Sequence, residues 1–206
     1  MIVSNQADLV KESQRLIIKI GSALLVDSET GEIRFNWLEK LADDIANLRS
    51  REKEVIIVSS GAVAFGSRHL GIHAKALKLQ EKQAAAATGQ IRLAYSYENA
   101  LNKHGVTIAQ ILLSPDDTEQ RRRHLNARAT ISTLLSLNVV PIINENDTVT
   151  TKELRFGDND RLGARVAQMV SADTLILLSD VDGLYNGDPR IDKTAHHIPI
   201  VKEITS

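Results

Sequence analysis

The chain has 206 residues, of which 43% are hydrophobic and 25% are charged, and its formal net charge is -1. This length fits one domain with a sizeable core, and the near-neutral charge offers no electrostatic argument for nucleic acid or membrane partners. The lack of cysteine excludes disulfides, thiolate catalysis and cysteine-ligated zinc and suits a cytoplasmic protein, and no apolar stretch approaches the length of a membrane span.

Short apolar runs alternate along the chain with stretches in which apolar residues recur at helical spacing. The runs predict strands, and the spaced stretches predict helices. In chain order we expect a strand at 15–20, a helix at 37–50, a strand at 55–59, a helix at about 78–104, a strand at 106–113, a helix at about 121–137, a strand at 139–143, a helix after residue 160 and a strand at 174–178. This alternation predicts an α/β fold with a parallel sheet covered on both faces.

Lys19 stands in a predicted strand that should be buried on both faces, where an unpartnered lysine is seldom tolerated. It lies beside Gly21 and Ser22 at the strand end, so its ammonium could reach a transferring phosphoryl group while backbone N–H groups approach the same anion. The alternative is a lysine that extends its ammonium into solvent from an edge strand.

The second predicted strand runs directly into Ser60, Gly61 and Ala62, small residues that join it to a helix. Such a junction presents free backbone N–H groups to an anion or a carboxylate. It is not a Walker A loop, because the Gly-Lys-[Ser/Thr] ending of that pattern is absent. By itself this signal is common in α/β proteins.

Two polar clusters, NEND at 144–147 and GDND at 157–160, follow one another closely. The first should emerge at the carboxyl end of the 139–143 strand, where open α/β sheets bind ligands. The second opens a helix that Asp158 or Asn159 can cap, and residues 148–156 predict a small hairpin over the site. Acids and amides so placed can grip an ammonium, organise a lysine or hold a metal ion, whereas the alternative is ordinary turn chemistry.

The segment LILLSDVDGLY at 175–185 is an apolar strand that ends in Asp-x-Asp-Gly, as in the nucleophile motif of haloacid-dehalogenase-type phosphatases. Too few residues follow Asp182 for the lysine and acidic pair that those enzymes place downstream. A nucleotide-binding loop, in which Ser179 and Asp180 meet the base or ribose, fits the order of elements better.

Seven blocks, taken in order, resemble those of the bacterial glutamate 5-kinases, a branch of the amino acid kinase superfamily. They are KIGS at 19–22, VSSGA at 58–62, QILL at 110–113, LNAR at 125–128, PIINEND at 141–147, FGDND at 156–160 and LSDVDGLY at 178–185. The resemblance implies an αβα sandwich and ATP-dependent phosphorylation of the γ-carboxylate of L-glutamate with Mg²⁺, the first step of proline synthesis. It also implies a homo-oligomer that proline inhibits by feedback.

The resemblance assigns roles to eight positions. It implies that Lys19 meets the ATP phosphates, that Asp160 orients phosphate-binding lysines, that Ser60, Asp147 and Asn159 bind glutamate beside Asn144 in the pocket wall, and that Ser179 and Asp180 contact ATP. The chemistry agrees, because a free α-ammonium calls for a carboxylate such as Asp147. Phosphoryl transfer, for its part, needs positioning and cationic charge rather than a covalent nucleophile.

The family pattern continues beyond the position of Ser206 with a Thr-Gly-Gly-Met-x-Thr-Lys segment, and many members add a PUA domain. Residues 1–206 contain neither, so we expect them to form an incomplete amino acid kinase domain. Two alternatives stay open. One is a related kinase for acetylglutamate or uridylate, which Asp147 disfavours because an acetylated amine needs no carboxylate partner. The other is a non-catalytic domain that binds glutamate or proline.

Overall fold

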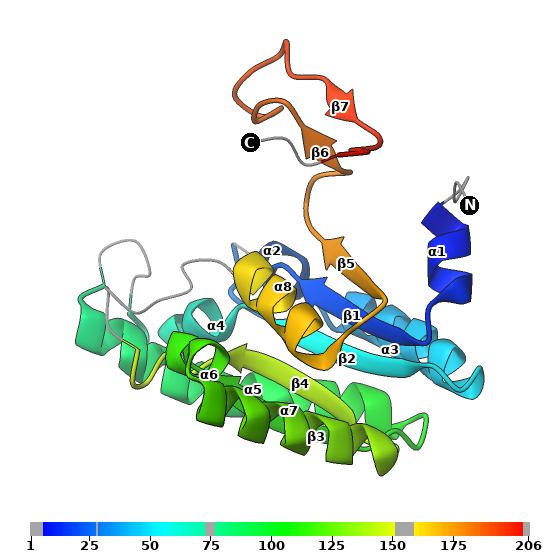
Figure 1. Cartoon of the computed structure of the whole chain (residues 1–206). Helices are drawn as coiled ribbons and strands as arrows, with labels where there is room; N and C mark the ends of the chain where they lie inside the picture. Colours follow the sequence, from blue (N-terminus) through cyan, green and yellow to red (C-terminus); the bar gives the residue numbers. More distant parts are fainter. Residues whose placement is uncertain (1–5, 28, 73–76, 151–158, 204–206) are drawn as a thin grey trace.

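A five-stranded sheet forms the centre of the computed structural model, which describes residues 6–27, 29–72, 77–150 and 159–203 (Figure 1). Its strands, in the spatial order β3-β4-β2-β1-β5, are all parallel. They are β1 (Arg15–Ile20), β2 (Glu54–Ser59), β3 (Ile108–Leu113), β4 (Val140–Glu145) and β5 (Thr174–Leu178). The predicted parallel sheet is therefore confirmed, and β1 lies inside it rather than at an edge.

Helices cover both faces of the sheet. One layer contains α3 (Phe35–Ser50), α4 (Ala62–His69) and α5 (Leu79–Asn102), and the other contains α6 (Pro115–Glu119), α7 (Arg121–Ser136) and α8 (Asn159–Val170). Two further helices, α1 (Gln6–Glu12) and the single turn α2 (Ser22–Leu25), were not predicted. The resulting αβα sandwich is the fold class that the sequence indicated.

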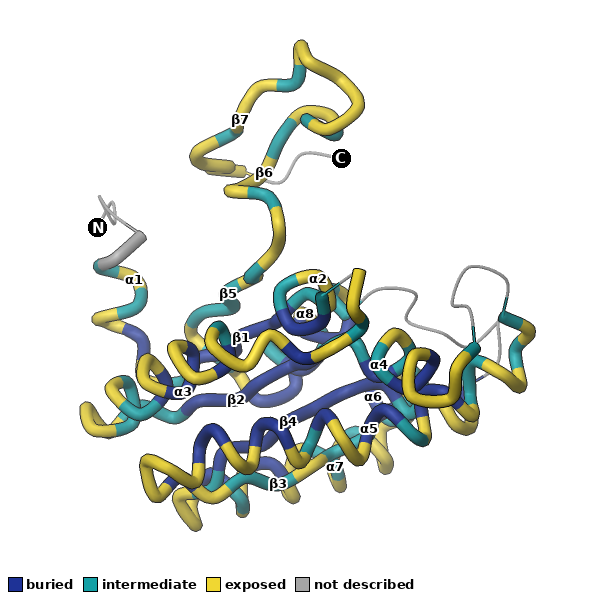
Figure 2. Tube along the Cα trace, turned by 180° about the vertical axis from the view of Figure 1, so that it is seen from behind, coloured by how far each residue is buried: buried dark blue, intermediate teal, exposed yellow. Residues whose placement is uncertain are grey.

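The buried residues follow from the apolar patterns in the sequence. Leu38, Leu41 and Ile45 of α3 are buried against the sheet, as their spacing predicted. On the opposite face, Leu162 and Val166 of α8 pack into a second cluster. Figure 2 shows the inner strands β1, β2 and β4 as the most continuously buried part of the chain.

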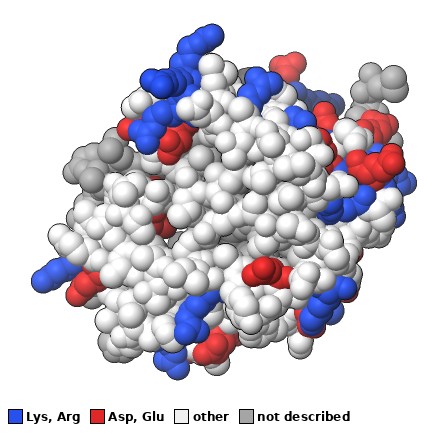
Figure 3. Space-filling model, turned by 90° about the horizontal axis from the view of Figure 1, so that it is seen from below, with Lys and Arg blue, Asp and Glu red and all other residues white. Residues whose placement is uncertain are grey.

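Charged side chains of both signs are interspersed on the surface, and Figure 3 shows no broad single-sign area on the face that it displays. The basic run that opens α7 is exposed, and within it Arg123 Nε lies 2.8 Å from a carboxylate oxygen of Asp117. The run thus forms part of a solvated helix face. No helix among the described residues combines the length and the apolarity that crossing a membrane requires.

The chain leaves the sheet after β5. A two-stranded antiparallel arm, formed by β6 (Leu184–Tyr185) and β7 (His197–Ile198), projects away from the sandwich in both Figure 1 and Figure 2. Within β5, Leu177 is 50% exposed. This edge and its arm are the least buried part of the described fold.

The end of β4 differs from the prediction. β4 continues through Asn144 and Glu145, so the prediction that both would emerge beyond the strand end was wrong. The strand extends because β3 pairs with it up to these residues, at Leu112 and Leu113. The hairpin predicted at 148–156 and the possible cap at Asp158 lie, from residue 151 to residue 158, outside the described residues.

Candidate active site

The carboxyl ends of β1, β2 and β4 surround a cavity of about 450 Å³. Parallel strands place all their carboxyl ends at one edge of a sheet, which is why residues far apart in the sequence meet there. The expected site residues in its lining are Lys19, Ser60, Asn144, Asp147, Asn159, Ser179 and Asp180. The structure therefore brings seven of the eight positions to one cavity, and their roles stay predictions.

The eighth position, Asp160, pairs with the cavity lysine. Lys19 Nζ lies 2.5 Å from Asp160 Oδ1, although Lys19 itself is only 7% exposed. Since β1 is an inner strand, the alternative of a lysine reaching solvent from a sheet edge was wrong. A buried ammonium held by one carboxylate at the rim of a cavity is placed to meet an anionic ligand.

Backbone geometry adds to the anion-facing wall. Gly61 joins β2 to α4 with a φ of +102°, a conformation that favours glycine, and it turns the first residues of α4 into the cavity lining. Gly21, after β1, donates its N–H to the carbonyl of Leu178 at 3.0 Å, which ties the end of β1 to the end of β5. The predicted junction at residues 60–62 is thus confirmed as a strand-to-helix turn.

A chain of amides forms the opposite wall. The Asn159 side-chain nitrogen donates to Ser59 O at 2.6 Å, to Ser60 Oγ at 2.9 Å and to Asn144 Oδ1 at 2.9 Å. The Asn144 nitrogen in turn donates to Gln90 Oε1 at 2.8 Å, and Asn144 Oδ1 also accepts the N–H of Glu145. These bonds connect β2, β4, α5 and α8 in one network.

Acidic side chains complete the same wall. Asp147, which follows β4, lines the cavity together with the buried Glu145. Glu145 stood inside a motif that the sequence singled out, but no role was predicted for it. The arrangement combines carboxylates and amide groups within reach of one small ligand, a set that suits an ammonium group.

Ser179 and Asp180 lie at the more exposed side of the cavity, directly after β5. The Ser179 hydroxyl donates to Asp180 Oδ1 at 3.2 Å, and Asp180 Oδ2 pairs with Arg190 of the projecting arm at 3.2 Å. Both residues are exposed. The two halves of the lining therefore differ in burial. The half that contains the amides is more buried, whereas the half that contains Ser179 and Asp180 is exposed to solvent.

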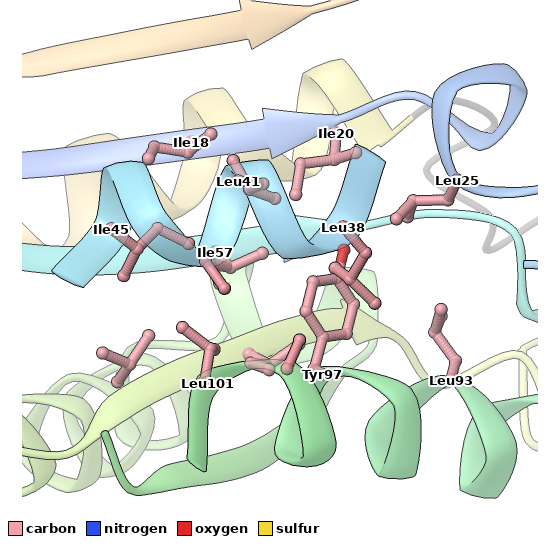
Figure 4. Close-up of a cluster of buried hydrophobic side chains, with 14 of the residues drawn as sticks. Ile18, Ile20, Leu25, Leu38, Leu41, Ile45, Ile57, Leu93, Tyr97 and Leu101 are labelled. Carbon is pink, nitrogen blue, oxygen red and sulfur yellow. The ribbon is translucent and has the colours of Figure 1, made fainter. Parts of the chain in front are cut away.

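Two polar residues of α5, for which no role was predicted, support the site from behind. Gln90 is 8% exposed and bonds to Asn144, and the hydroxyl of the fully buried Tyr97 lies 3.0 Å from Ser59 Oγ. Figure 4 shows Tyr97 between Leu93 and Leu101, with its hydroxyl oxygen directed away from the helix. Burial raises the pKa of Tyr97 far above its ordinary value, so the phenol stays neutral.

A second cavity, of about 470 Å³, adjoins the first and shares with it Ser22, Ala23 and Ala64. Its charged lining residues are Asp27, Glu29 and Arg68. None of the eight predicted positions lines it, so substitutions of its residues should leave the first cavity unchanged.

The fold and the site together define a class of αβα protein that has a polar cavity at the carboxyl end of its parallel sheet. Solved structures share the fold: UMP kinase from Bacillus anthracis, with a TM-score of 0.58 and 18% identity over 90% of this chain and 72% of that one, is an example. An isopentenyl phosphate kinase from T. acidophilum, in a product complex, aligns with a TM-score of 0.60 and 16% identity, over 88% of this chain and 76% of that one.

The chain belongs to the amino acid kinase family, whose family model matches residues 14–204. It is 64% identical over 193 residues to a glutamate 5-kinase of Paramagnetospirillum magneticum, covering 94% of this chain and 52% of the relative. A glutamate 5-kinase of Gluconobacter oxydans is 57% identical over 205 residues, covering 100% of this chain and 54% of the relative. The chain thus spans about half the length of these curated relatives.

Proposed function

We propose that this chain is the part of a glutamate 5-kinase that binds L-glutamate and the transferring phosphoryl group. A γ-carboxylate oxygen of glutamate attacks the γ-phosphorus of ATP, the bond from that phosphorus to the ADP oxygen breaks, and L-glutamyl 5-phosphate and ADP are formed. The observation that carries the proposal is the single cavity that contains both Lys19 and the carboxylate-and-amide wall around Asp147.

In this proposal the internal wall binds the amino-acid end of glutamate. Asp147 accepts a charge-assisted hydrogen bond from the α-ammonium, while Ser60, Asn144 and Asn159 supply neutral polar groups around it. An N-acetylated amine would not offer the positive charge that Asp147 calls for. The wall therefore favours glutamate over acetylglutamate as the substrate.

Lys19 supplies the cationic charge at the opposite side. Its ammonium, held by Asp160, stabilises negative charge on the phosphoryl oxygens during transfer, and this role requires no covalent nucleophile. Ser179 and Asp180 would contact the nucleotide from the exposed side of the cavity. The lysine, the adjacent glycine turns and the nearby carboxylates form a donor set that fits a nucleotide phosphate.

Mg²⁺ fits the same site only as a companion of the phosphates. Among the described residues, no group of three or more histidine, cysteine or acidic side chains is arranged to hold a metal. Mg²⁺ commonly uses one or two carboxylates together with substrate phosphates and water, and when bound it neutralises phosphate charge. Asp180, in the cavity lining, is the residue that we assign to this contact.

The resemblance of the sequence motifs to the glutamate 5-kinases leads to four finer proposals. We infer that the reaction is the first step of proline synthesis, that proline inhibits it by feedback, that the protein is a homo-oligomer and that it is cytoplasmic. Residues 1–206 would belong to one amino acid kinase domain. Binding of glutamate without any binding of an ATP analogue would instead indicate an amino-acid-binding domain.

Calorimetric titration with glutamate and with N-acetylglutamate tests the substrate assignment. We expect Asp147→Asn to weaken glutamate binding by about 2 kcal/mol, because the variant loses a charged hydrogen-bond partner, and to leave any N-acetylglutamate binding almost unchanged. Glu29→Gln, in the adjoining cavity, is the matched control and should bind both ligands like the wild type. Equal losses for both ligands in Asp147→Asn would refute the ammonium assignment.

A further inference from the structure

One face of α5 contacts the back of the candidate site at three places. Gln83, Gln90 and Tyr97 are spaced by seven residues and therefore share that face. Gln83 Nε2 donates to the carbonyl of Thr150 at 3.3 Å, Gln90 accepts from Asn144, and Tyr97 bonds to Ser59. The helix thus reaches the segment after β4, the end of β4 and the end of β2.

A close helix crossing brings α5 to this position. A Cβ atom at Gly89 would lie 1.9 Å from the carbonyl oxygen of Ala62, and one at Gly66 would lie 1.8 Å from that of Ala85. Only glycine allows the backbones of α4 and α5 to approach so closely. Gln90 directly follows Gly89, so the crossing sets where its side chain begins.

The orientation of each amide in the network follows from its partner. The Asn144 nitrogen donates to the oxygen of Gln90, while its oxygen accepts from Asn159 and from the backbone N–H of Glu145, so Gln90 and Glu145 favour the same orientation of Asn144. The Asn159 nitrogen is directed toward Asn144 by three acceptors, which are Asn144 Oδ1, Ser59 O and Ser60 Oγ. An amide nitrogen has only two hydrogens, so these three acceptor oxygens leave no hydrogen of the Asn159 side chain for a ligand.

The side-chain oxygen of Asn159 takes part in none of these three bonds. An oxygen accepts hydrogen bonds, and an ammonium only donates them. The amide chain from Gln90 therefore ends in an acceptor on the same wall as Asp147, at the place where the proposed function puts the α-ammonium. Gln90 itself would not contact the ligand, because it is buried and is not part of the cavity lining.

We propose that Gln90 is a positioning residue for the amino-acid end of the substrate. Its oxygen holds the Asn144 side chain in place, and Asn144, together with Ser59 O and Ser60 Oγ, holds the Asn159 amide in the orientation that accepts the ammonium. This inference rests on the proposed function for the identity of the ligand, but not for the hydrogen-bond chain itself. Removing the Gln90 oxygen would leave the Asn144 nitrogen buried without its acceptor, so the asparagine would shift to find another and weaken its bond with Asn159.

Two substitutions at position 90 separate the hydrogen bond from the packing. Gln90→Met keeps the length and the helix propensity of the side chain but removes the oxygen, whereas Gln90→Glu retains an acceptor oxygen. Ser96→Ala is the matched control, because Ser96 is also buried in α5 but its hydroxyl donates only to Arg92 O in the same helix. Each protein is titrated with glutamate and with a non-hydrolysable ATP analogue.

We expect Gln90→Met to bind glutamate about ten-fold more weakly, because an unsatisfied buried group disturbs the amide chain. Gln90→Glu should recover to within about three-fold of the wild type, Ser96→Ala should match the wild type, and the affinity for the ATP analogue should not change in any variant. A purely structural role would instead affect both ligands, and Ser96→Ala would behave like Gln90→Met.

Side-chain amide NMR signals provide a readout that does not depend on glutamate being the substrate. In ¹H–¹⁵N spectra, Gln90→Met should shift the Asn144 and Asn159 side-chain signals, whereas Ser96→Ala should leave them in place. If the wild type does not bind glutamate, the proposed function fails. The side-chain amide signals would still show whether Gln90 orients the amides of Asn144 and Asn159. Unchanged Asn159 signals together with unchanged glutamate binding in Gln90→Met would overturn the inference.

If Gln90→Met does not fold, an NMR titration of the wild-type chain with glutamate tests the inference instead. Glutamate should then shift the Gln90 side-chain amide signal even though Gln90 lies outside the cavity lining. A titration that moves the Asn144 and Asn159 signals but not that of Gln90 would contradict a positioning role.

Discussion

The two sides of the candidate site are built in opposite ways. The side formed by β2, β4 and α8 is internal, and its amides bond to one another, to backbone and to buried residues of α5. The side that follows β5 is exposed, and Asp180 is held there by an exposed ion pair with Arg190. Exposed ion pairs contribute little stability, whereas a buried polar network rigidifies its surroundings.

This contrast indicates that the side that we propose to bind glutamate is organised before any ligand binds. The side that we propose to contact the nucleotide depends on a sheet edge and on a projecting arm, both of which have few buried neighbours (Figure 2). Substitutions on the two sides should therefore have different consequences.

Lys19→Ala should have the largest effect, because Lys19 is the buried cation at the boundary between the two sides. We expect phosphoryl transfer to glutamate to fall by roughly 10² to 10³, the scale of losing one preorganised charge donor, while glutamate affinity changes little. A coupled assay that compares variant and wild type at the same chain length measures this. Lys53→Ala is the matched control, because Lys53 directly precedes β2, at the end of that strand away from the cavity, and donates to the carbonyls of Lys11 and Ser13. A large rise in KM for glutamate with an unchanged kcat would place Lys19 in the substrate pocket instead.

A pair of isoleucines compares an inner strand with the edge strand directly. Ile57 of β2 and Ile176 of β5 both stand opposite Ile18, one on each side of β1, but only Ile57 is fully buried. Ile57→Ala should lower the free energy of unfolding by about 4 kcal/mol and Ile176→Ala by only about 1 kcal/mol. Urea unfolding of both variants tests this. Equal losses would show that the edge is as well packed as the centre.

Two glycines test the close helix crossing behind the amide side. Gly89→Ala should lower the free energy of unfolding by about 3 kcal/mol or more, because the new methyl group would collide with backbone atoms of α4. Gly163→Ala in α8 is the matched control, since a Cβ there meets only ordinary contacts at 3.5 Å or more. It should be neutral or stabilising by up to about 1 kcal/mol. Thermal unfolding of the two proteins separates these outcomes, and similar losses would contradict the crossing.

The smallest effect concerns the amino end of the edge strand. Asp173 Oδ2 accepts the backbone N–H groups of Arg15 and Gln14, and these two bonds lower the pKa of Asp173 from its ordinary value of 3.8. A lowered pKa in the folded state means that the stabilisation is complete above the ordinary value and disappears as the pH falls through the lowered one.

Asp173→Asn should therefore be less stable than the wild type at about pH 6, and the gap should narrow at about pH 3. Urea midpoints of both proteins at the two pH values measure the gap. Parallel pH curves for the two proteins would mean that the Asp173 carboxylate contributes nothing through its charge.

Much of this architecture could be predicted from local patterns. The strand over residues 15–20 was correct at both ends, because an apolar run closed by glycine has few alternatives. The end of β4 was misjudged, since Asn144 and Glu145 look like loop residues but pair with β3. Pairing with a neighbouring strand overrode local propensity there, as it often does in sheets.

The sequence by itself determined which residues have the chemistry for the site and in what order along the chain the strands that position them occur. A lysine in an apolar strand, a carboxylate among amides and their family resemblance were all readable from the printed residues. Only the tertiary structure decided that Lys19 lies inside the sheet and that Gln90 and Tyr97 support the site from behind. The physical reason is that these contacts join residues far apart in the sequence, such as Lys19 and Leu177 in neighbouring strands, or Asn144 and Gln90, which are 54 positions apart. No local periodicity specifies such a pairing.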